Sequence, residues 1–140
     1  MSARRAVIPG SQWNAVNLRD ATAADNCGIT PEDQPVIAGG PDAYFSSLPV
    51  KEITAALKHH GIPAFVSNSA GTYVCNNVMY TLLHLIRSRN LPIQGGFIHV
   101  PYSMEQAAHK TSSVPSMALE HMTKGLELAI DVPVSYTHLT

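Results

Sequence analysis

Cys75 is placed in this sequence where a cysteine could act as a nucleophile. A short apolar run at residues 64–66 precedes a Ser-, Asn- and Gly-rich stretch, and apolar residues then recur at helical spacing through Arg89. This pattern predicts a buried strand, a bend, and a helix that carries Cys75 in its first turn. A helix N-terminus favours a thiolate over a thiol and can hold the oxyanion of an attacked carbonyl. A buried cysteine that only packs is the alternative that position leaves open.

A histidine near the end of a second predicted strand could work with this cysteine. Residues 95–102 have the composition of a strand, and His99 lies close to its C-terminal end. If the strands before Cys75 and at His99 are parallel neighbours, both side chains project from one edge of the sheet, where reactive groups of α/β folds gather. The two residues could then form a thiolate–imidazolium pair.

The segments around both residues resemble the two catalytic segments of the pyroglutamyl-peptidase I (pyrrolidone carboxylate peptidase) family. They read SNSAGTYVCN at residues 67–76 and GFIHVP at residues 96–101. Upstream, NLRDA at 17–21, DNCG at 25–28 and GPDAYF at 40–45 resemble the family too. Because several separated motifs occur in the family's order, over about residues 12–130, the resemblance is specific.

The resemblance implies a cysteine peptidase that removes N-terminal pyroglutamate from peptides and needs no metal or organic cofactor. It also implies an α/β fold, a three-layer α/β/α sandwich around a mainly parallel sheet. By motif, Cys75 is the nucleophile and His99 is the general base that later protonates the leaving amine. Tyr73 and Val74 fall where the family lines its pyrrolidone pocket. Ala23 stands where the family usually has a larger apolar residue, which would loosen one pocket wall.

Gln12 occupies the position at which the family carries a glutamate that orients the catalytic histidine. Its amide oxygen can still accept the imidazole N–H and fix the tautomer, but it supplies no negative charge. Alternatively, the first dozen residues are foreign and the glutamate has been lost. Asp25 matches an acidic position near the family's site, where we expect a structural role.

The family's chains carry a further N-terminal segment that this sequence does not show. We therefore expect a single truncated domain at residues 1–131, with the sheet incomplete on its N-terminal side and with impaired activity as the 140-residue chain. Residues 1–11 are candidates for non-native sequence. We expect residues 132–140 to be a non-native tail, because 134–140 resemble a translated sequencing adapter, and we expect Pro133 to interrupt the helical pattern.

Composition agrees with a globular, cytoplasmic protein. Hydrophobic residues make up 45% of the chain and charged residues 14%, with a net charge of −1, so a nucleic-acid surface is not expected. No apolar run reaches the roughly 20 residues that a bilayer requires, so no membrane partner is expected. The two cysteines and the absence of a recognisable secretion signal favour free thiols. A peptide with N-terminal pyroglutamate is the expected partner, and a homo-oligomer stays open.

The remaining elements follow from turn residues and periodicity. We expect a strand at 13–18, a long loop at 22–37, a helix that opens at Leu48–Pro49 with Ser46 or Ser47 as its cap, and a closing helix at 113–130.

Two rival functions stay open. One is a non-catalytic α/β binding module that keeps the fold, and the other is a cysteine hydrolase of different specificity.

Overall fold

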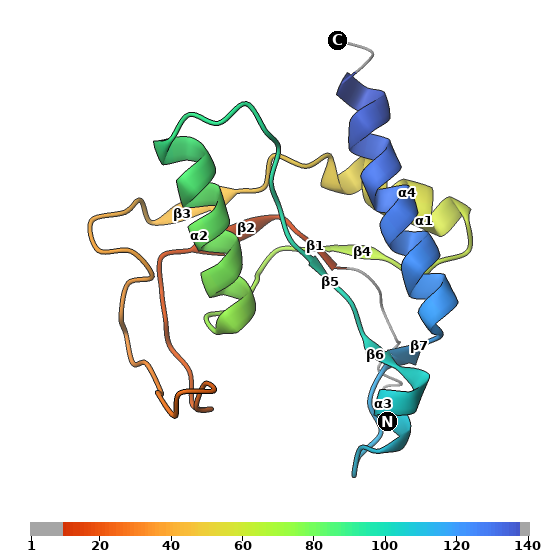
Figure 1. The fold of residues 1–140 in the computed structure, drawn as a ribbon, viewed down its shortest axis with the longest axis horizontal. Helices are drawn as coiled ribbons and strands as arrows, with labels where there is room; N and C mark the ends of the chain where they lie inside the picture. The colour runs from red at the N-terminus through yellow and green to blue at the C-terminus, as the bar shows by residue number, and fades with distance from the viewer. Residues whose placement is uncertain (1–9, 138–140) are drawn as a thin grey trace. The chain divides into compact units, whose positions relative to one another are not determined.

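The computed structural model describes residues 10–137, with side chains described for residues 12–133 (Figure 1). The chain folds into two compact units. The first comprises Met1–Ser11, Pro49–Val66 and Ile98–Thr140, and the second comprises Gln12–Leu48 and Ser67–Phe97. The elements in chain order are β1 (Gly10–Gln12), β2 (Asn14–Val16), β3 (Ala43–Phe45), α1 (Val50–His59), β4 (Phe65–Ser67), α2 (Val74–Ser88), β5 (Ile98–His99), β6 (Tyr102–Ser103), α3 (Met104–Ala108), β7 (Ser116–Met117) and α4 (Leu119–Thr137).

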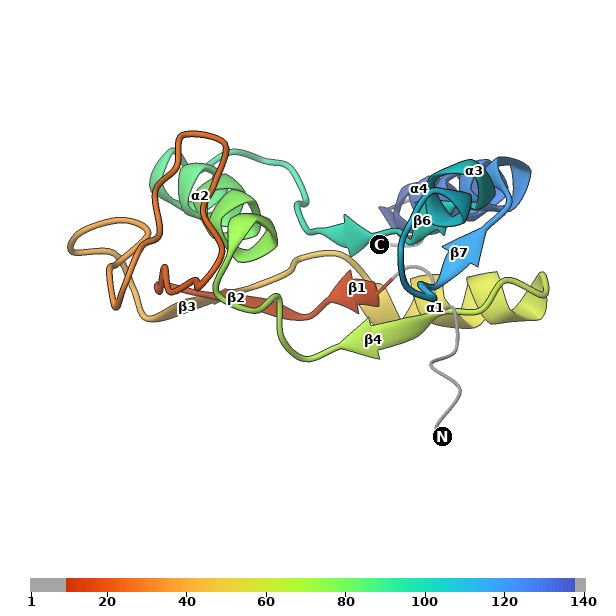
Figure 2. The ribbon, with the colours of Figure 1, turned by 90° about the horizontal axis from the view of Figure 1, so that it is seen from below.

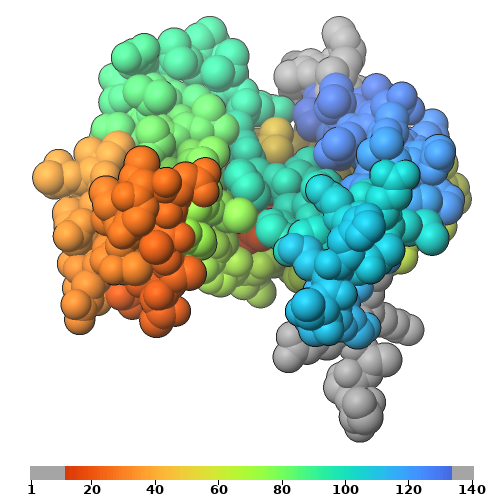
Figure 3. Space-filling view, turned by 60° about the horizontal axis from the view of Figure 1, so that its bottom comes forward, coloured from red at the N-terminus to blue at the C-terminus, as the bar shows by residue number. Residues whose placement is uncertain are grey.

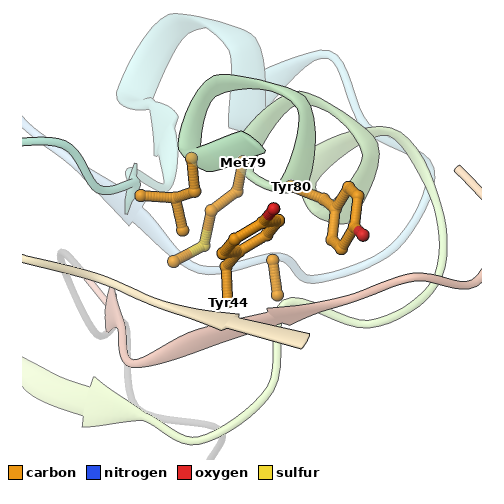
Figure 4. Packing of buried hydrophobic residues seen from close by; sticks show 5 residues of the cluster. Tyr44, Met79 and Tyr80 are labelled. Carbon is orange, nitrogen blue, oxygen red and sulfur yellow. The ribbon is translucent and has the colours of Figure 1, made fainter. Parts of the chain in front are cut away.

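The second unit is built from an antiparallel pair of strands and one long helix. β2 pairs with β3, with Ala15 opposite Tyr44, and α2 packs on this pair (Figure 2). The small Ala15 leaves room for the rings of Tyr44 and Tyr80, whose centroids lie 5.0 Å apart (Figure 4). Met79 and Leu83 complete this buried cluster. Burying side chains of this size contributes roughly 1.5–3 kcal/mol each, which fixes α2 against the strands.

The apolar pattern of α2 is wider than its buried face. Met79, Leu83 and Ile86 are buried as the helical spacing predicts. Val78 and Leu82 belong to the same pattern, but they are 53% and 37% exposed. Helical periodicity therefore identified the helix correctly and overestimated the face that this unit buries.

The first unit is organised around the packing of α1 against α4. Val50, Ile53 and Leu57 are the buried apolar residues of α1, and Gly61 follows the helix with a positive φ of 74°. Gly125 of α4 is buried and would bring a Cβ to 3.4 Å from Leu57 Cδ2, so the two helices pack closely there. β6 and β7 pair in parallel, and Ser103 caps α3 through a reciprocal bond pair with Gln106.

The strand order differs from the sequence prediction, although the α/β class is confirmed. β1 lies between β4 and β5, so the strands before Cys75 and at His99 are not the parallel neighbours that the sequence analysis considered. β1 pairs antiparallel with β5, with Gly10 opposite His99. β2 and β3 also pair antiparallel, whereas β6 and β7 pair in parallel. The short strand before β2 escaped prediction because its pairing partners are distant in sequence.

The ends of two helices also differ from expectation. α4 begins at Leu119 rather than at 113, because Ser116–Met117 is a strand and Pro115 precedes it. The helix then continues through Pro133 to Thr137, so the prediction that Pro133 interrupts it is wrong. A proline inside a helix removes one N–H donor and destabilises the helix locally, but it does not always end the helix. The N-cap of α1 is Pro49, without a side-chain bond.

Ser46, one of the two predicted caps, bonds elsewhere. Its Oγ accepts from the Leu48 N–H and donates to the Gly95 carbonyl.

In the described part of the chain, no helix combines the length and the apolarity that a membrane crossing needs. The expectations for residues 1–11 and 132–140 fall partly on 1–9 and 138–140, which lie outside the described residues.

Candidate active site

Local turn chemistry sets where α2 begins. Ser67 Oγ donates to the Ser69 carbonyl at 2.9 Å, and Ser69 Oγ accepts from the Gly71 N–H at 3.0 Å. Gly71 takes a positive φ of 71°, which a residue with a side chain adopts only at a cost. Tyr73 is the N-cap, and Cys75 is the second residue of the helix and is half-buried. The prediction that Cys75 lies in the first turn of a helix after a strand and a bend is confirmed.

Asn76 fastens this helix start to β2. The side chain is fully buried, and its Nδ2 donates to the Val16 carbonyl at 2.8 Å and the Leu18 carbonyl at 3.1 Å. Its Oδ1 accepts from the Val16 N–H at 2.9 Å. One side chain thus satisfies three main-chain groups, and Cys75 is held one residue away from a fixed point of the fold.

The long loop lies against the start of α2. The Asp20 N–H donates to the Thr72 carbonyl at 3.1 Å, and the Thr72 hydroxyl donates to the Asp20 carbonyl at 2.6 Å. The Tyr73 hydroxyl donates to the Ala24 carbonyl at 2.8 Å. In Figure 3 the orange segment, which contains this loop, lies beside green residues of the α2 region. The structure therefore brings Tyr73 to the loop that carries Ala23, whose side chain is exposed.

Asp25 holds the turn of the same loop. Its Oδ1 accepts from the Cys27 N–H at 2.8 Å and from the Ile29 N–H at 2.9 Å. This bond pattern is a side-chain turn of the kind that Asp favours, and it agrees with the structural role expected for Asp25. Cys27, on the turn, is exposed.

The other predicted residues are distributed between the two units. Gln12, Tyr73, Val74 and Cys75 belong to the second unit, and His99 belongs to the first. His99 ends β5 as predicted, and its side chain is exposed. Gln12 ends β1 and is only 7% exposed. Its Oε1 has no hydrogen-bond partner within the part of the chain that the structure describes.

Two aromatic hydroxyls and a histidine share the core of the second unit. Tyr44 Oη and His84 Nδ1 lie 2.9 Å apart, and the Tyr80 hydroxyl donates to the Pro41 carbonyl at 2.6 Å. Burial raises the pKa of the Tyr80 hydroxyl, and electrostatic interactions with Tyr44 and Asp42 raise it further. Across residues 10–137, no group of three His, Cys, Asp or Glu side chains is arranged to hold a metal ion.

The sequence analysis missed two residues of this region. Asn76 follows the cysteine directly, but the sequence alone does not show that its side chain bonds to β2. Arg19, half-buried beside the helix start, lies in the NLRDA segment, to which the sequence analysis assigned no role. One hint for Asn76 was available: it is a polar residue at a position of α2 that the helical spacing of apolar residues predicts to be buried.

The family profile described as pyroglutamyl peptidase matches residues 3–136 of this chain. A pyrrolidone-carboxylate peptidase of Thermococcus kodakarensis is 55% identical over 116 residues, which are 83% of this chain and 55% of the relative. One from Brevibacillus brevis is 48% identical over 122 residues, 87% of this chain and 56% of the relative. The chain therefore spans about half the length of the curated relatives it matches.

Two solved structures are similar to the fold. The pyrrolidone carboxyl peptidase from Thermococcus litoralis superposes with a TM-score of 0.88 at 42% identity, over 95% of this chain and 62% of that one. The pyroglutamyl peptidase I from Bacillus amyloliquefaciens gives a TM-score of 0.85 at 42% identity, over 91% and 60% of the two chains.

Proposed function

This chain belongs to the pyroglutamyl peptidase family, and from that premise we propose that the complete protein removes N-terminal pyroglutamate from peptides with Cys75 as its nucleophile. The observation that carries the proposal is the position of Cys75 as the second residue of α2, after a strand and a hydrogen-bonded bend. The unpaired N–H groups at the helix start can hold the oxyanion that forms during attack.

The proposed reaction has two stages. Cys75 Sγ attacks the pyroglutamyl carbonyl carbon while His99 accepts the thiol proton. The C–N bond then breaks, and His99 returns that proton to the leaving amine, which leaves a thioester on Cys75. A water molecule, deprotonated by His99, attacks the thioester; pyroglutamic acid leaves, and the thiol is restored. The proposed partner is a peptide with N-terminal pyroglutamate.

We assign the orientation of the His99 ring to Gln12, and the motif resemblance and two structural observations support the assignment. By motif, Gln12 corresponds to the glutamate expected from the family resemblance. It also ends the strand whose Gly10 lies opposite His99, and its buried Oε1 is an acceptor without a partner among the described residues. An amide oxygen that accepts the imidazole N–H fixes the tautomer that leaves the other ring nitrogen free for the proton.

Tyr73, Val74 and Ala23 are proposed to line the pyrrolidone pocket. Val74 is 49% exposed and apolar, which suits contact with the ring methylenes of a lactam. Tyr73, fixed through its bond to the Ala24 carbonyl, holds the loop of Ala23 beside the helix start.

The test of the proposal is release of a fluorescent amine from its pyroglutamyl derivative by the complete protein. We expect turnover that Cys75→Ser abolishes and that Cys27→Ser, at the other cysteine of the chain, leaves unchanged. Turnover that survives Cys75→Ser would show that another group is the nucleophile.

A non-catalytic binding module is the second candidate, and the neutral Gln12 at the position of the acid favours it. In that case the complete protein would bind pyroglutamyl peptides and leave them intact at every pH, and Gln12→Glu would not create turnover.

A further inference from the structure

One asparagine side chain ties together the two ends of the segment that joins β2 to β3. This segment, the β2–β3 connection, comprises residues 17–42. Asn17 Nδ2 donates to the Ile37 carbonyl at 2.9 Å and to the Gly40 carbonyl at 3.2 Å, and Asn17 Oδ1 accepts from the Ile37 N–H at 3.0 Å. Three hydrogen bonds from one side chain therefore close the neck of the connection, where residue 17 meets residues 37–42.

The neck also has a fixed place against α2. The Asn17 N–H donates to the Asp42 carbonyl at 2.8 Å, which extends the pairing of β2 with β3 by one residue. The Tyr80 hydroxyl of α2 donates to the Pro41 carbonyl at 2.6 Å. A Cβ added to Gly40 would lie 2.5 Å from the Tyr80 oxygen, so the main chain approaches the helix too closely for a side chain there. The neck is therefore held in one position within the second unit.

A ladder of main-chain hydrogen bonds links the neck to the tip of the connection. Its steps pair Arg19 with Gln34, Ala21 with Pro31, and Asp25 with Ile29, at N···O distances of 2.5–3.1 Å. A pair of short segments joined by few bonds is only marginally stable by itself. The order of the tip therefore depends on the closure of the neck.

The tip of the connection contributes one wall of a small cavity beside the start of α2. The bonds of Asp20 to Thr72 and of Tyr73 to Ala24 join the connection to the helix start. The cavity has a volume of about 30 Å³, and its lining residues are Arg19, Asp25 and Pro31 of the connection and Thr72, Tyr73, Val74 and Asn77 of the helix start. Since Val74 directly precedes Cys75, the position of the connection shapes the surface next to the proposed nucleophile.

We propose that Asn17 is a positioning residue for substrate binding, a role that rests on the proposed function. Its side-chain bonds all go to the neck, so it acts on the substrate only through the connection, which carries Ala23 and is bonded to Tyr73. The role requires an amide, because one side chain supplies donors to two carbonyls and an acceptor to one N–H. An ionised aspartate has no donor, and alanine has neither group.

Asn76 makes an equal set of three main-chain bonds but holds a different part of the site. Its partners are the main-chain groups of Val16 and Leu18, and it directly follows Cys75 in α2. Loss of the Asn76 side chain releases the helix start that carries the nucleophile, so it should lower kcat. Loss of the Asn17 side chain leaves that helix start bonded to β2 and frees the connection, so it should raise KM.

The experiment compares kcat and KM of the complete protein with those of Asn17→Ala and Asn17→Asp, by release of a fluorescent amine from its pyroglutamyl derivative. We expect KM to rise about 10-fold or more in both variants, because substrate binds only the molecules whose connection is in place. The kcat should stay at the parent value, because saturating substrate selects those molecules. A role in stability alone would instead reduce the amount of folded enzyme, which lowers the apparent kcat and leaves KM unchanged.

Gln34→Ala is the matched control for loss of an amide from the same connection. The Gln34 side chain is exposed and makes no hydrogen bond among the described residues. Its bonds to Arg19 are main-chain bonds, which survive the change. Gln34→Ala should therefore keep the kcat and the KM of the parent.

Hydrogen exchange tests the hold of Asn17 on the connection without catalysis. In the parent, the N–H groups of Arg19, Ala21 and Asp25 should exchange slowly, since each donates a hydrogen bond within the ladder. In Asn17→Ala their exchange should be about 10-fold or more faster, whereas the N–H groups of α2 should exchange as in the parent. Ladder N–H groups that exchange in the parent as fast as in an unfolded peptide would overturn the inference, even if neither variant folds.

An unchanged KM in Asn17→Ala and Asn17→Asp would also overturn the inference, as would an equal rise of KM in Gln34→Ala. These outcomes are separate from that of the proposed function. A complete protein without turnover contradicts the peptidase proposal, and the exchange measurement then still decides whether Asn17 holds the connection. Turnover with an unchanged KM in the Asn17 variants contradicts only the role of Asn17.

Discussion

Truncating Asn76 to alanine should destabilise the protein far more than a change at a neighbouring helix surface would. The side chain is fully buried and bonds to the Val16 N–H, the Val16 carbonyl and the Leu18 carbonyl. Asn76→Ala removes all three bonds and leaves these main-chain groups beneath α2, where water reaches them poorly. The start of α2 is thereby released from β2.

The expected loss follows from the count of bonds. Three hydrogen bonds at about 1 kcal/mol each give about 3 kcal/mol, and main-chain groups left buried without partners raise the loss further, since each can cost about 1–3 kcal/mol. The higher helix propensity of alanine returns at most about 0.7 kcal/mol. We therefore expect Asn76→Ala to lower the free energy of unfolding by about 2–5 kcal/mol.

Urea unfolding of the complete protein measures this change, with the fluorescence of Trp13 as the probe. Asn68→Ala is the matched control, because the Asn68 side chain is exposed and makes no hydrogen bond among the described residues. It should change the free energy of unfolding by less than about 0.5 kcal/mol. A loss below about 1 kcal/mol for Asn76→Ala would show that Asn76 does not hold α2 to β2.

Three further outcomes are expected. Gln12→Glu should raise turnover by up to about 10⁴-fold by supplying the missing charge, and equal turnover of the two proteins would remove Gln12 from the catalytic set. Gly125→Ala should raise the free energy of unfolding by about 0.5–1 kcal/mol, because the new Cβ meets Leu57 Cδ2 at 3.4 Å, an ordinary contact, and alanine favours a helix; destabilisation would mean that α1 and α4 pack more tightly than this. Because burial raises the pKa of Tyr80, unfolded tyrosine loses its proton first, so stability should fall as pH rises above about 10. Tyr80→Phe should remove the part of this alkaline decline that Tyr80 causes, and an unchanged unfolding profile between pH 9 and 11 would contradict the assignment.

Local sequence signals predicted the elements near Cys75 because those elements are locally determined. The bend before α2 is built from its own Ser and Gly residues, and the buried face of α2 repeats at helical spacing. The order β4–β1–β5 depends on pairing between residues almost 90 positions apart, such as Gly10 and His99, and no local pattern encodes it. The same applies to β7, a two-residue strand that took the place of a predicted helical turn.

The candidate site divides in the same way. Cys75 and His99 were identified from motifs, and the structure places them at a helix start and a strand end as predicted. Asn76 and Arg19 were missed because only the fold shows their surroundings. Asn76 is fully buried, and Arg19 lines the cavity beside the start of α2. A polar residue becomes informative only when the fold shows which of its hydrogen bonds are made.

The most direct test of the proposed peptidase chemistry is mass spectrometry of the complete protein after rapid mixing with a pyroglutamyl ester or amide at low pH. The account predicts an added pyroglutamyl group that peptide mapping assigns to Cys75, that Cys75→Ser abolishes, and that disappears as pyroglutamic acid is released. A pyroglutamyl adduct on Cys27 or on another residue, or hydrolysis that proceeds unchanged in Cys75→Ser, would contradict the assignment of Cys75 as the nucleophile.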